Sequence, residues 1–474
     1  MSEAREHCGL FGVYGCEDAV ERVYYGLYSL QHRGEESAGI ASTDGKDIVF
    51  YKGMGLVNDV IKPQTLKFLK NPIAIGHVRY STIGSSNIGN AQPLVVDYYK
   101  GKVAVAHNGQ LTNAKKLRDE FEANGSIFHT TSDTEVIVHL MAKPLNMMQR
   151  SLSLVLSQLR GSFSLLFLTP EEMVGVRDLH GFRPLALGRL NNGYVMASET
   201  CALDQVGAEY IRDINPGEAV YVGKNGVRSE YYCPREYIKP AFCIFELVYF
   251  ARPDSKVYGE NVHMFRKKLG AKLAEESPVD ADVVISVPEG GNSAAIGYSH
   301  YSKIPFDRGF IRNHYVGRTF ILPEQDRRHR IVELKLNALK ETVEGKRVVV
   351  VDDSIVRGTT SKSRLGLLRK AGAKEIHVRI SCPPHRHPCY YGIDFQKKGE
   401  LIAADHTLEE IRQFLGVESL RYLSVEGMMS CATQPGQNFC NACFTGNYPT
   451  IIEEDTKKLA EGEAQHLKEL EKVC

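Results

Sequence analysis

Two acidic residues, Asp352 and Asp353, follow an apolar run of valines at 348–351 and precede a loop of small and polar residues. The run predicts a buried strand, and the amphipathic stretch 361–371 predicts a helix after the loop. Backbone N–H groups at such a helix N-terminus bind phosphate, and the carboxylates can bind Mg²⁺ or sugar hydroxyls. The pattern predicts a site for a phosphorylated sugar. The alternative is an ordinary strand-to-helix turn with two exposed acids.

A second reactive candidate is Cys8, which follows the short polar segment 1–7. This segment lacks the apolar core of a secretion signal, so we do not expect export. Its removal would leave Cys8 with a free α-amino group beside the thiol. That amine can act as the general base, as in N-terminal nucleophile hydrolases. A buried structural cysteine is the alternative interpretation.

A third candidate is the pair Cys440-Asn-Ala-Cys443, together with Cys243 and Cys389 far upstream. Four thiolates can hold either zinc or an iron–sulfur cluster. The spacing alone favours zinc, because a single CxxC pair with distant partners is common for that metal. Unliganded buried cysteines are the third possibility.

The composition limits the class of protein. A chain of 474 residues is long enough for two or more domains. The net charge of +1, with both signs mixed, gives no electrostatic case for nucleic acid or a membrane surface. No apolar stretch is long enough to span a bilayer. Eleven cysteines without an export signal indicate catalysis or metal binding rather than disulfides. We expect a soluble, cytoplasmic protein.

The elements that position these residues differ between the two halves. In the first half, short apolar strands mixed with helices suit an α+β sandwich. In the second half, strands alternate with helices, which indicates a parallel sheet. We place the boundary near residue 238. The predicted strands are 11–14, 40–42, 73–78, 103–107, 164–168, 283–287, 348–351 and 375–380; the predicted helices are 17–30, 113–122, 134–141, 151–159, 361–371 and 453–474.

Two sets of motifs resemble known families. In order along the chain, five segments resemble the glutaminase domain of class II amidotransferases: Cys8-Gly-Leu-Phe-Gly-Val, Gln31-His-Arg-Gly34, Gly76-His-Val-Arg-Tyr-Ser-Thr82, His107-Asn-Gly109 and Ser132-Asp-Thr-Glu135. The segment 348–360 resembles the phosphoribosyl-diphosphate (PRPP) signature of type I phosphoribosyltransferases. With both sets present, the chain resembles the amidophosphoribosyltransferase family almost end to end.

The resemblance implies a propeptide at 1–7, an N-terminal nucleophile (Ntn) hydrolase αββα sandwich at 8–238, an α/β type I phosphoribosyltransferase domain with a parallel sheet at 239–452, and a charged C-terminal helix at 453–474. It implies hydrolysis of glutamine at Cys8 and transfer of the ammonia to PRPP. The products are 5-phosphoribosylamine, glutamate and pyrophosphate, in the first committed step of purine synthesis. The family also implies a homotetramer and purine nucleotides as possible inhibitors.

The resemblance assigns a role to each matching residue. Asn108 and Gly109 stabilise the oxyanion, Arg79 holds the α-carboxylate of glutamine, and Asp133 holds its α-amine. In one branch of the family four cysteines bind a 4Fe-4S cluster, and this overrides the preference for zinc; the matching residues are Cys243, Cys389, Cys440 and Cys443. Asp352 and Asp353 also bind Mg²⁺, and the PRPP-binding residues are Asp352, Asp353, Ser354, Arg357, Gly358, Thr359, Thr360, Ser361 and Lys335.

Three positions depart from the family pattern. Glu333 stands where the family has arginine, and Leu322 replaces a glutamine, both near the polar stretch 324–337 that the resemblance makes a lid over PRPP. Gly290 lacks the hydroxyl that commonly follows Glu289. The rival interpretations are another class II amidotransferase, which would lack the 352–360 loop, and a PRPP-binding repressor, which would not need Cys8, Asn108 and Asp133 together.

Overall fold

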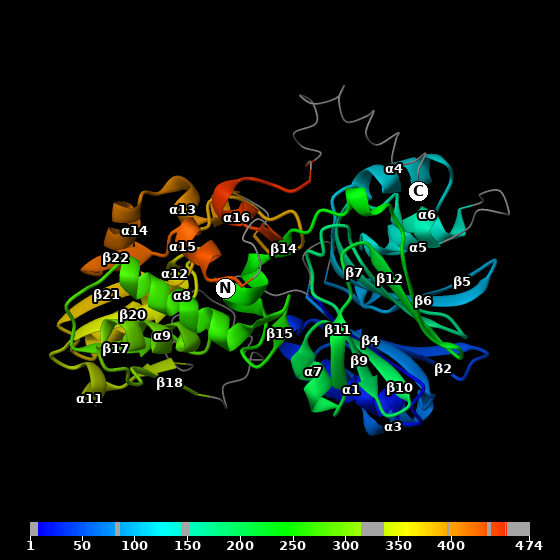
Figure 1. The fold of residues 1–474 in the computed structure, drawn as a ribbon, viewed down its shortest axis with the longest axis horizontal. Coiled ribbons are helices and arrows are strands. Elements are labelled where there is room, and N and C mark those ends of the chain that lie inside the picture. Colours follow the sequence, from blue (N-terminus) through cyan, green and yellow to red (C-terminus); the bar gives the residue numbers. More distant parts are fainter. Residues whose placement is uncertain are drawn as a thin grey trace.

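The computed structural model describes residues 8–80, 86–143, 152–313, 336–395, 398–433, 438–450 and 452. Two bodies lie side by side, one rich in strands and one built around a smaller sheet with helices on it (Figure 1). Buried apolar side chains divide in the same way. Three clusters draw on residues between Leu10 and Cys233, and the fourth draws on residues 241–452 together with Phe182.

Two antiparallel sheets form the first body. One has seven strands in the order β11 (Glu209–Asp213), β9 (Ala186–Leu190), β10 (Gly193–Ala197), β1 (Gly9–Tyr14), β4 (Ile73–Arg79), β2 (Ser37–Thr43) and β3 (Ile48–Met54). The other has six strands in the order β13 (Gly226–Tyr231), β12 (Glu218–Gly223), β8 (Met173–Arg177), β7 (Gly161–Leu168), β6 (Gly101–Leu111) and β5 (Leu94–Tyr98).

The first body has four layers, in the order helices, sheet, sheet, helices. Buried apolar side chains fill each of the three interfaces between them. The layer between the sheets contains Leu10, Ile75 and Leu166. Outside the seven-stranded sheet lie α1 (Ala19–Ser29) and α7 (Thr200–Gln205), whose buried side chains join those of the strands. Outside the six-stranded sheet lie α4 (Ala114–Ala123), α5 (Thr134–Ala142) and α6 (Leu152–Leu156). The αββα sandwich predicted from the resemblance is therefore confirmed.

The second body contains a parallel sheet in the order β17 (Val283–Ser286), β20 (Arg347–Asp352), β21 (Glu375–Ile380) and β22 (Ser419–Tyr422). The valines of β20 are buried on both faces, as a continuous apolar run requires. The larger helices of this body are α8 (Val262–Glu276), α9 (Asn292–Ser302), α12 (Thr359–Lys370), α14 (Leu408–Leu415) and α15 (Val425–Ser430). The predicted parallel sheet is confirmed.

A small parallel pair joins two distant segments of the second body. It consists of β14 (Phe242–Cys243) and β23 (Phe439–Cys440), and it places Cys243 directly opposite Cys440. The remaining elements are short: η1 (Gln31–Arg33), α2 (Val57–Val60), α3 (Pro63–Phe68), η2 (Ile88–Asn90), η3 (Arg235–Tyr237), η4 (Glu246–Phe250), β15 (Lys256–Val257), β16 (Glu260–Asn261), β18 (Phe310–Arg312), β19 (Leu336–Ala338), α11 (Lys340–Val343), η5 (Lys398–Glu400), α13 (Ile402–Asp405) and α16 (Ala442–Thr445).

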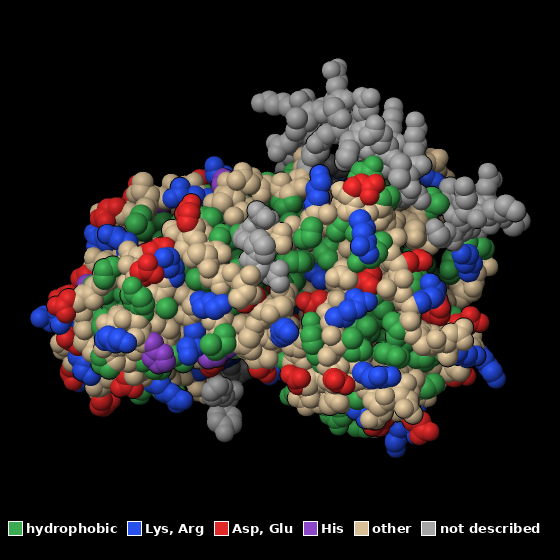
Figure 2. Space-filling view, in the orientation of Figure 1, with side chains coloured by type: hydrophobic (Ala, Val, Ile, Leu, Met, Phe, Trp, Pro, Cys, Tyr) green, Lys and Arg blue, Asp and Glu red, His purple; other side chains and the backbone are tan. Residues whose placement is uncertain are grey.

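The predicted elements within the described residues have the expected type, and their ends differ by a few residues. The helix after the acidic pair begins at Thr359 rather than at 361, because the left-handed Gly358 ends the loop there. The predicted propeptide and C-terminal helix lie outside the described residues. No helix in the described part of the chain is long and apolar enough to cross a membrane. On the face shown in Figure 2, acidic and basic side chains are interspersed over both bodies.

Candidate active sites and a four-cysteine cavity

Cys8 lies directly before β1, which runs between β10 and β4 in the seven-stranded sheet. The thiol is half-buried, and its Sγ donates a weak hydrogen bond to the carbonyl of Tyr80 at 3.8 Å. Burial raises the pKa of this thiol, Arg79 lowers it, and Asp133 raises it. The two residues predicted to hold glutamine therefore lie within electrostatic reach of the predicted nucleophile.

Asn108 is a fully buried polar residue in β6. Neither side-chain atom, Nδ2 or Oδ1, has a hydrogen-bond partner among the described residues. Buried polar groups are rarely left without partners, so such a group points to a ligand that completes it. An amide N–H aimed at a substrate oxygen is the role that the resemblance assigns to Asn108.

Gly109 follows in the same strand with a φ of 146°, in a region that favours glycine. A Cβ atom there would lie 2.1 Å from the carbonyl oxygen of Ser162. No other residue fits without moving β6 or β7.

Asp133 and Arg79 are both anchored by protein groups. The Oδ2 atom of Asp133 accepts from the N–H of Leu111 at 2.9 Å, and Oδ1 lies 3.7 Å from Nδ1 of His107. Burial alone would raise the pKa of Asp133, but His107 and the backbone hydrogen bonds hold it below the usual value. Arg79 donates to Glu36 at 2.7 Å. A charged carboxylate and a fixed guanidinium suit the two ends of an amino acid.

Asp352 ends β20 at the carboxyl edge of the parallel sheet, Asp353 follows it directly, and both are buried. The N–H of Asp353 donates to Oδ1 of Asp352 at 3.0 Å, and Ser354 Oγ donates to Oδ1 of Asp353 at 2.7 Å. Arg364 lies 4.0 Å from Asp352. Ligands of open α/β sheets bind at this edge of the strands.

The loop after the acids leads into α12, a helix of 12 residues. Gly358 caps it with a φ of 76°, and a Cβ atom there would meet Ile402 at 2.9 Å. Thr359, Thr360 and Ser361 form the first turn, whose N–H groups suit a phosphate. Arg357 pairs with Glu400 at 3.1 Å. The predicted phosphate loop thus has a helix N-terminus and hydroxyls in one place.

The loop 288–291 approaches the same carboxylates from the end of the neighbouring strand β17. A Cβ atom on Gly291 would lie 2.4 Å from the carbonyl oxygen of Val351. A Cβ atom on Gly290 would lie 1.6 Å from Oδ2 of Asp353. Lys335, Glu333 and Leu322, with most of the predicted lid at 324–337, lie outside the described residues.

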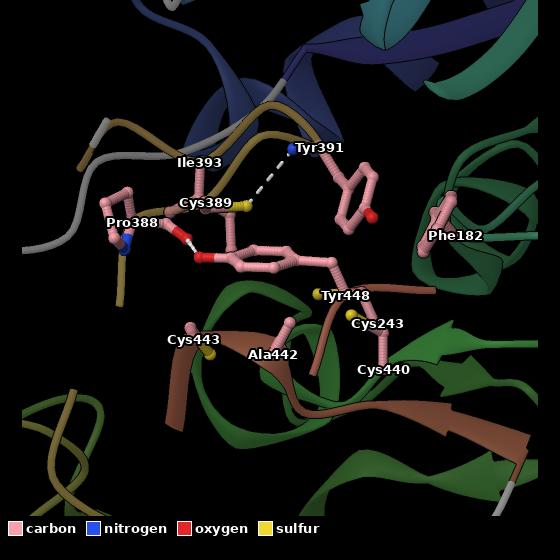
Figure 3. A pocket seen from close by; sticks show the side chains of 10 residues that line it. All are labelled: Phe182, Cys243, Pro388, Cys389, Tyr391, Ile393, Cys440, Ala442, Cys443 and Tyr448. Carbon is pink, nitrogen blue, oxygen red and sulfur yellow. Dashed lines mark hydrogen bonds between the residues drawn. The ribbon is translucent and has the colours of Figure 1, made fainter. Parts of the chain in front are cut away.

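Four buried cysteines line one small cavity, shown in Figure 3. Its volume is about 20 Å³, close to the space of one water molecule. Aromatic residues Phe182, Tyr391 and Tyr448 complete much of its wall. The cysteines are those predicted to hold a cluster: Cys243, Cys389, Cys440 and Cys443. Cys382 is also buried but does not belong to the lining.

Four thiols around one cavity are a donor set for either a zinc ion or an iron–sulfur cluster. Within the described ranges, no three His, Cys, Asp or Glu side chains form a group that could hold one metal ion. Zinc requires its thiolates about 2.3 Å from a single point, whereas a four-iron cluster binds each thiolate at a separate iron. Burial raises the pKa of Cys243 to about 11, and the nearby Arg183 lowers it.

Arg183 supplies a second sign of fit. It is fully buried, and its Nε atom has no hydrogen-bond partner among the described residues. It also lowers the pKa of Cys389, so its charge lies close to two of the four sulfurs. Its Nη atoms bind Glu246 and the carbonyl of Tyr391, and the unused Nε donor of this cation suits an anionic thiolate-bound group nearby.

Sequence reasoning missed the residues that support these sites. Two of them lie within motifs: Arg33 in Gln31-His-Arg-Gly34, and Glu246 three residues after Cys243. Arg183 and Glu199 carry no motif signal. All four are buried and ion-paired with one another.

Comparisons with known proteins show the family to which the chain is similar. Residues 77–205 match the model of a glutamine amidotransferase domain. The chain is 49% identical to the amidophosphoribosyltransferase of Bacillus subtilis, over 95% of this chain and 96% of that one. It is 46% identical to that of Methanothermobacter thermautotrophicus, over 96% and 97%. A solved structure of glutamine PRPP amidotransferase from B. subtilis, complexed with ADP and GMP, superposes with a TM-score of 0.89 at 48% identity, covering 94% of this chain and 98% of that one.

Proposed function

The chain belongs to the amidophosphoribosyltransferases, enzymes of purine biosynthesis with a glutamine amidotransferase domain, and from this premise we propose which residues carry each half-reaction. The glutaminase half occupies residues 8–238 and the phosphoribosyltransferase half residues 239–452. The division of the apolar clusters between Cys233 and Ala241 supports this boundary. The unpartnered, fully buried Asn108 beside Gly109 is the observation that carries the glutaminase assignment.

In the glutaminase half, Cys8 Sγ attacks the side-chain amide carbon of glutamine. The C–N bond breaks, ammonia leaves with the proton it needs, and a glutamyl thioester remains for water to hydrolyse. Asn108 Nδ2 and the N–H of Gly109 stabilise the oxyanion of each tetrahedral intermediate. Because burial raises the pKa of Cys8, the thiol requires a base. Cleavage after residue 7 supplies one as the new α-amine.

Substrate binding follows from the charges around Cys8. Arg79 binds the α-carboxylate of glutamine, and Asp133 binds its α-ammonium group. The hydrogen bonds that Asp133 accepts keep it ionised, so it can bind a cation without first losing a proton. Both side chains are fixed before the substrate arrives, which reduces the entropy lost on binding.

In the second half, ammonia attacks C1 of PRPP and displaces pyrophosphate, giving 5-phosphoribosylamine. The first turn of α12, from Thr359 to Ser361, holds the 5′-phosphate with its backbone N–H groups. Asp352 and Asp353 bind the ribose hydroxyls and Mg²⁺, and Lys335 contributes from the lid. When bound, Mg²⁺ neutralises the charge of the leaving pyrophosphate.

We also propose that the four-cysteine cavity holds a 4Fe-4S cluster. The four lining thiols and the unused Nε of the nearby Arg183 support it. Neither Asp352 nor Asp353 lines the cavity, so we assign the cluster a structural role rather than contact with the reacting atoms. Free thiols at all four positions suit a reducing compartment, which supports a cytoplasmic location.

Nucleotide binding and assembly remain proposals drawn from the relatives. The B. subtilis structure is complexed with ADP and GMP, and we propose that purine nucleotides inhibit this chain too. The exposed side chains of Tyr25, Tyr28 and Phe68 suit burial between subunits, which supports a homotetramer. Light scattering would measure the assembled mass directly.

The proposed function is tested by Cys8→Ala. We expect this variant to lose glutamine-dependent synthesis and to keep ammonia-dependent synthesis from PRPP, because only the ammonia source is removed. Cys16→Ala is the matched control, since Cys16 is also half-buried but lies beyond β1. Equal loss of both activities in Cys8→Ala, or undiminished use of glutamine, would contradict the division of labour.

A further inference from the structure

A network of buried, ion-paired side chains connects Cys8 to the second body. Arg33 is 1% exposed, and its Nε donates to the backbone carbonyl of Cys8 at 3.3 Å. Its Nη1 and Nη2 donate to the two carboxylate oxygens of Glu246 at 3.0 and 2.7 Å. Glu246 is fully buried in η4 and belongs to the second body. Arg33 also pairs with Glu199, which lies in the first body.

The same network of ion pairs continues to the four-cysteine cavity. Arg183 donates through Nη1 to Glu246 at 3.0 Å and through Nη2 to the carbonyl oxygen of Tyr391 at 2.7 Å. Tyr391 lines the cavity and lies two residues after Cys389 (Figure 3). Glu246 thus accepts hydrogen bonds from two arginines. Arg33 binds the backbone of Cys8, and Arg183 binds the backbone of Tyr391 in the cavity wall.

A second contact reaches the oxyanion site from the same wall. Gly392, with a φ of 97°, lies so close to β6 that a Cβ atom there would be 3.1 Å from the carbonyl carbon of Gly109. The segment that carries Cys389 therefore packs directly against the glycine proposed to stabilise the oxyanion.

We propose that Glu246 and Gly392 are positioning residues of the glutaminase site and that filling the cavity orders Cys8 and Gly109. Glu246 is linked to the cavity wall through Arg183, and Gly392 lies between the lining residues Tyr391 and Ile393. The inference rests on the proposed function of Cys8. A shift of about 1 Å in a reacting group can cost on the order of 100-fold in rate, and a close-packed wall transmits such shifts. Loss of the Glu246 charge would leave two buried guanidinium groups sharing a neutral partner.

The first test is Glu246→Gln in the full-length, iron-loaded protein. We expect glutamine-dependent kcat to fall by at least about 10-fold with KM for glutamine little changed, because the nucleophile is displaced while the substrate contacts remain. Ammonia-dependent synthesis and iron content should stay at the wild-type level. Glu218→Gln is the matched control, because Glu218 is 2% exposed and accepts two hydrogen bonds from Arg212, and among the described residues neither of these two forms a hydrogen bond with Arg33, Glu246 or Arg183.

Hydrogen exchange supplies the second readout. Peptides covering 8–14 and 107–111 should exchange faster in Glu246→Gln and in iron-stripped wild-type protein, whereas peptides covering β13 should not change. Gly392→Ala should show the same pattern, since its side chain would press on Gly109.

Wild-type kcat for glutamine in both variants overturns the proposal, and so does a proportional loss of both activities. Unchanged exchange on iron removal overturns the coupling to the cavity. Cys8→Ala tests the glutaminase assignment separately, so a failure of that assignment can be told apart from a failure of the positioning role of Glu246 and Gly392.

Discussion

Gly290 lies against Asp353 so closely that a Cβ atom there would be 1.6 Å from the carboxylate oxygen Oδ2. A side chain at position 290 would therefore have to displace the carboxylate of Asp353. The departure at Gly290 is therefore part of how this chain packs the PRPP loop against the acidic pair.

Gly290→Ser should displace Asp353 and reduce synthesis with either nitrogen donor by about 10-fold or more, because Mg²⁺ and ribose contacts depend on that carboxylate. Glutamine hydrolysis should continue. Gly366→Ala is the control, since a Cβ atom on Gly366 meets nothing within 4 Å. Near-normal synthesis by Gly290→Ser would remove Asp353 from the site.

Asp352→Asn should abolish PRPP-dependent synthesis while leaving the fold intact, because the amide keeps the shape but loses the charge that binds Mg²⁺. Pyrophosphate release is the measurement. Asp280→Asn, at a carboxylate whose side chain is 87% exposed, should behave like the wild type. If Asp352→Asn turns over normally, the acidic pair has no part in the reaction.

Asn108→Ala should lower glutamine-dependent kcat by about 100- to 1000-fold, the usual cost of one oxyanion donor. KM for glutamine should change much less, because Arg79 and Asp133 still bind the substrate. Steady-state kinetics with glutamine and with ammonia separate these effects. A loss of less than about 10-fold would mean that Gly109 alone stabilises the oxyanion.

The buried Glu199 should make stability depend on acid pH. Burial alone would raise its pKa, but His32 and Arg33 hold it well below the usual range. A folded-state pKa below the unfolded value of about 4.3 stabilises the protein above that pH, and this contribution is lost as pH falls further. Urea unfolding of the wild type should show the loss, and Glu199→Gln should show a flatter profile below pH 5. If the stability of the wild type and of Glu199→Gln falls in parallel with pH, the pairing of Glu199 with His32 and Arg33 is contradicted.

Anaerobic purification followed by iron analysis and intact mass should give about four irons per chain and the loss of residues 1–7. Cys443→Ser should lose the iron, and Cys382→Ser should keep it, although both thiols are buried. A full-length chain that holds zinc would contradict both the maturation step and the cluster.

Local sequence signals predicted much of the fold and of the sites. The valine run, the acidic pair and the helix after it are contiguous, so their pattern specifies β20 and α12. The cysteine set could be proposed from motifs. The supporting ion pairs could not, because Arg33 and Glu246 are 213 residues apart and only packing brings them together. The contact between Gly392 and Gly109 could not be predicted either, because the two glycines are far apart in the sequence and meet only in the folded structure.

The contact between Arg33 and Glu246 also bears on the order in which the enzyme is synthesised. Both sheets of the glutaminase half are complete by Tyr231, and a ribosome makes them first. On our proposal, the nucleophile is not correctly held until Glu246 and then the late cysteines have been added. A nascent or truncated chain would then hydrolyse little glutamine. The cell would thus be protected from a glutaminase that releases ammonia before its acceptor site exists.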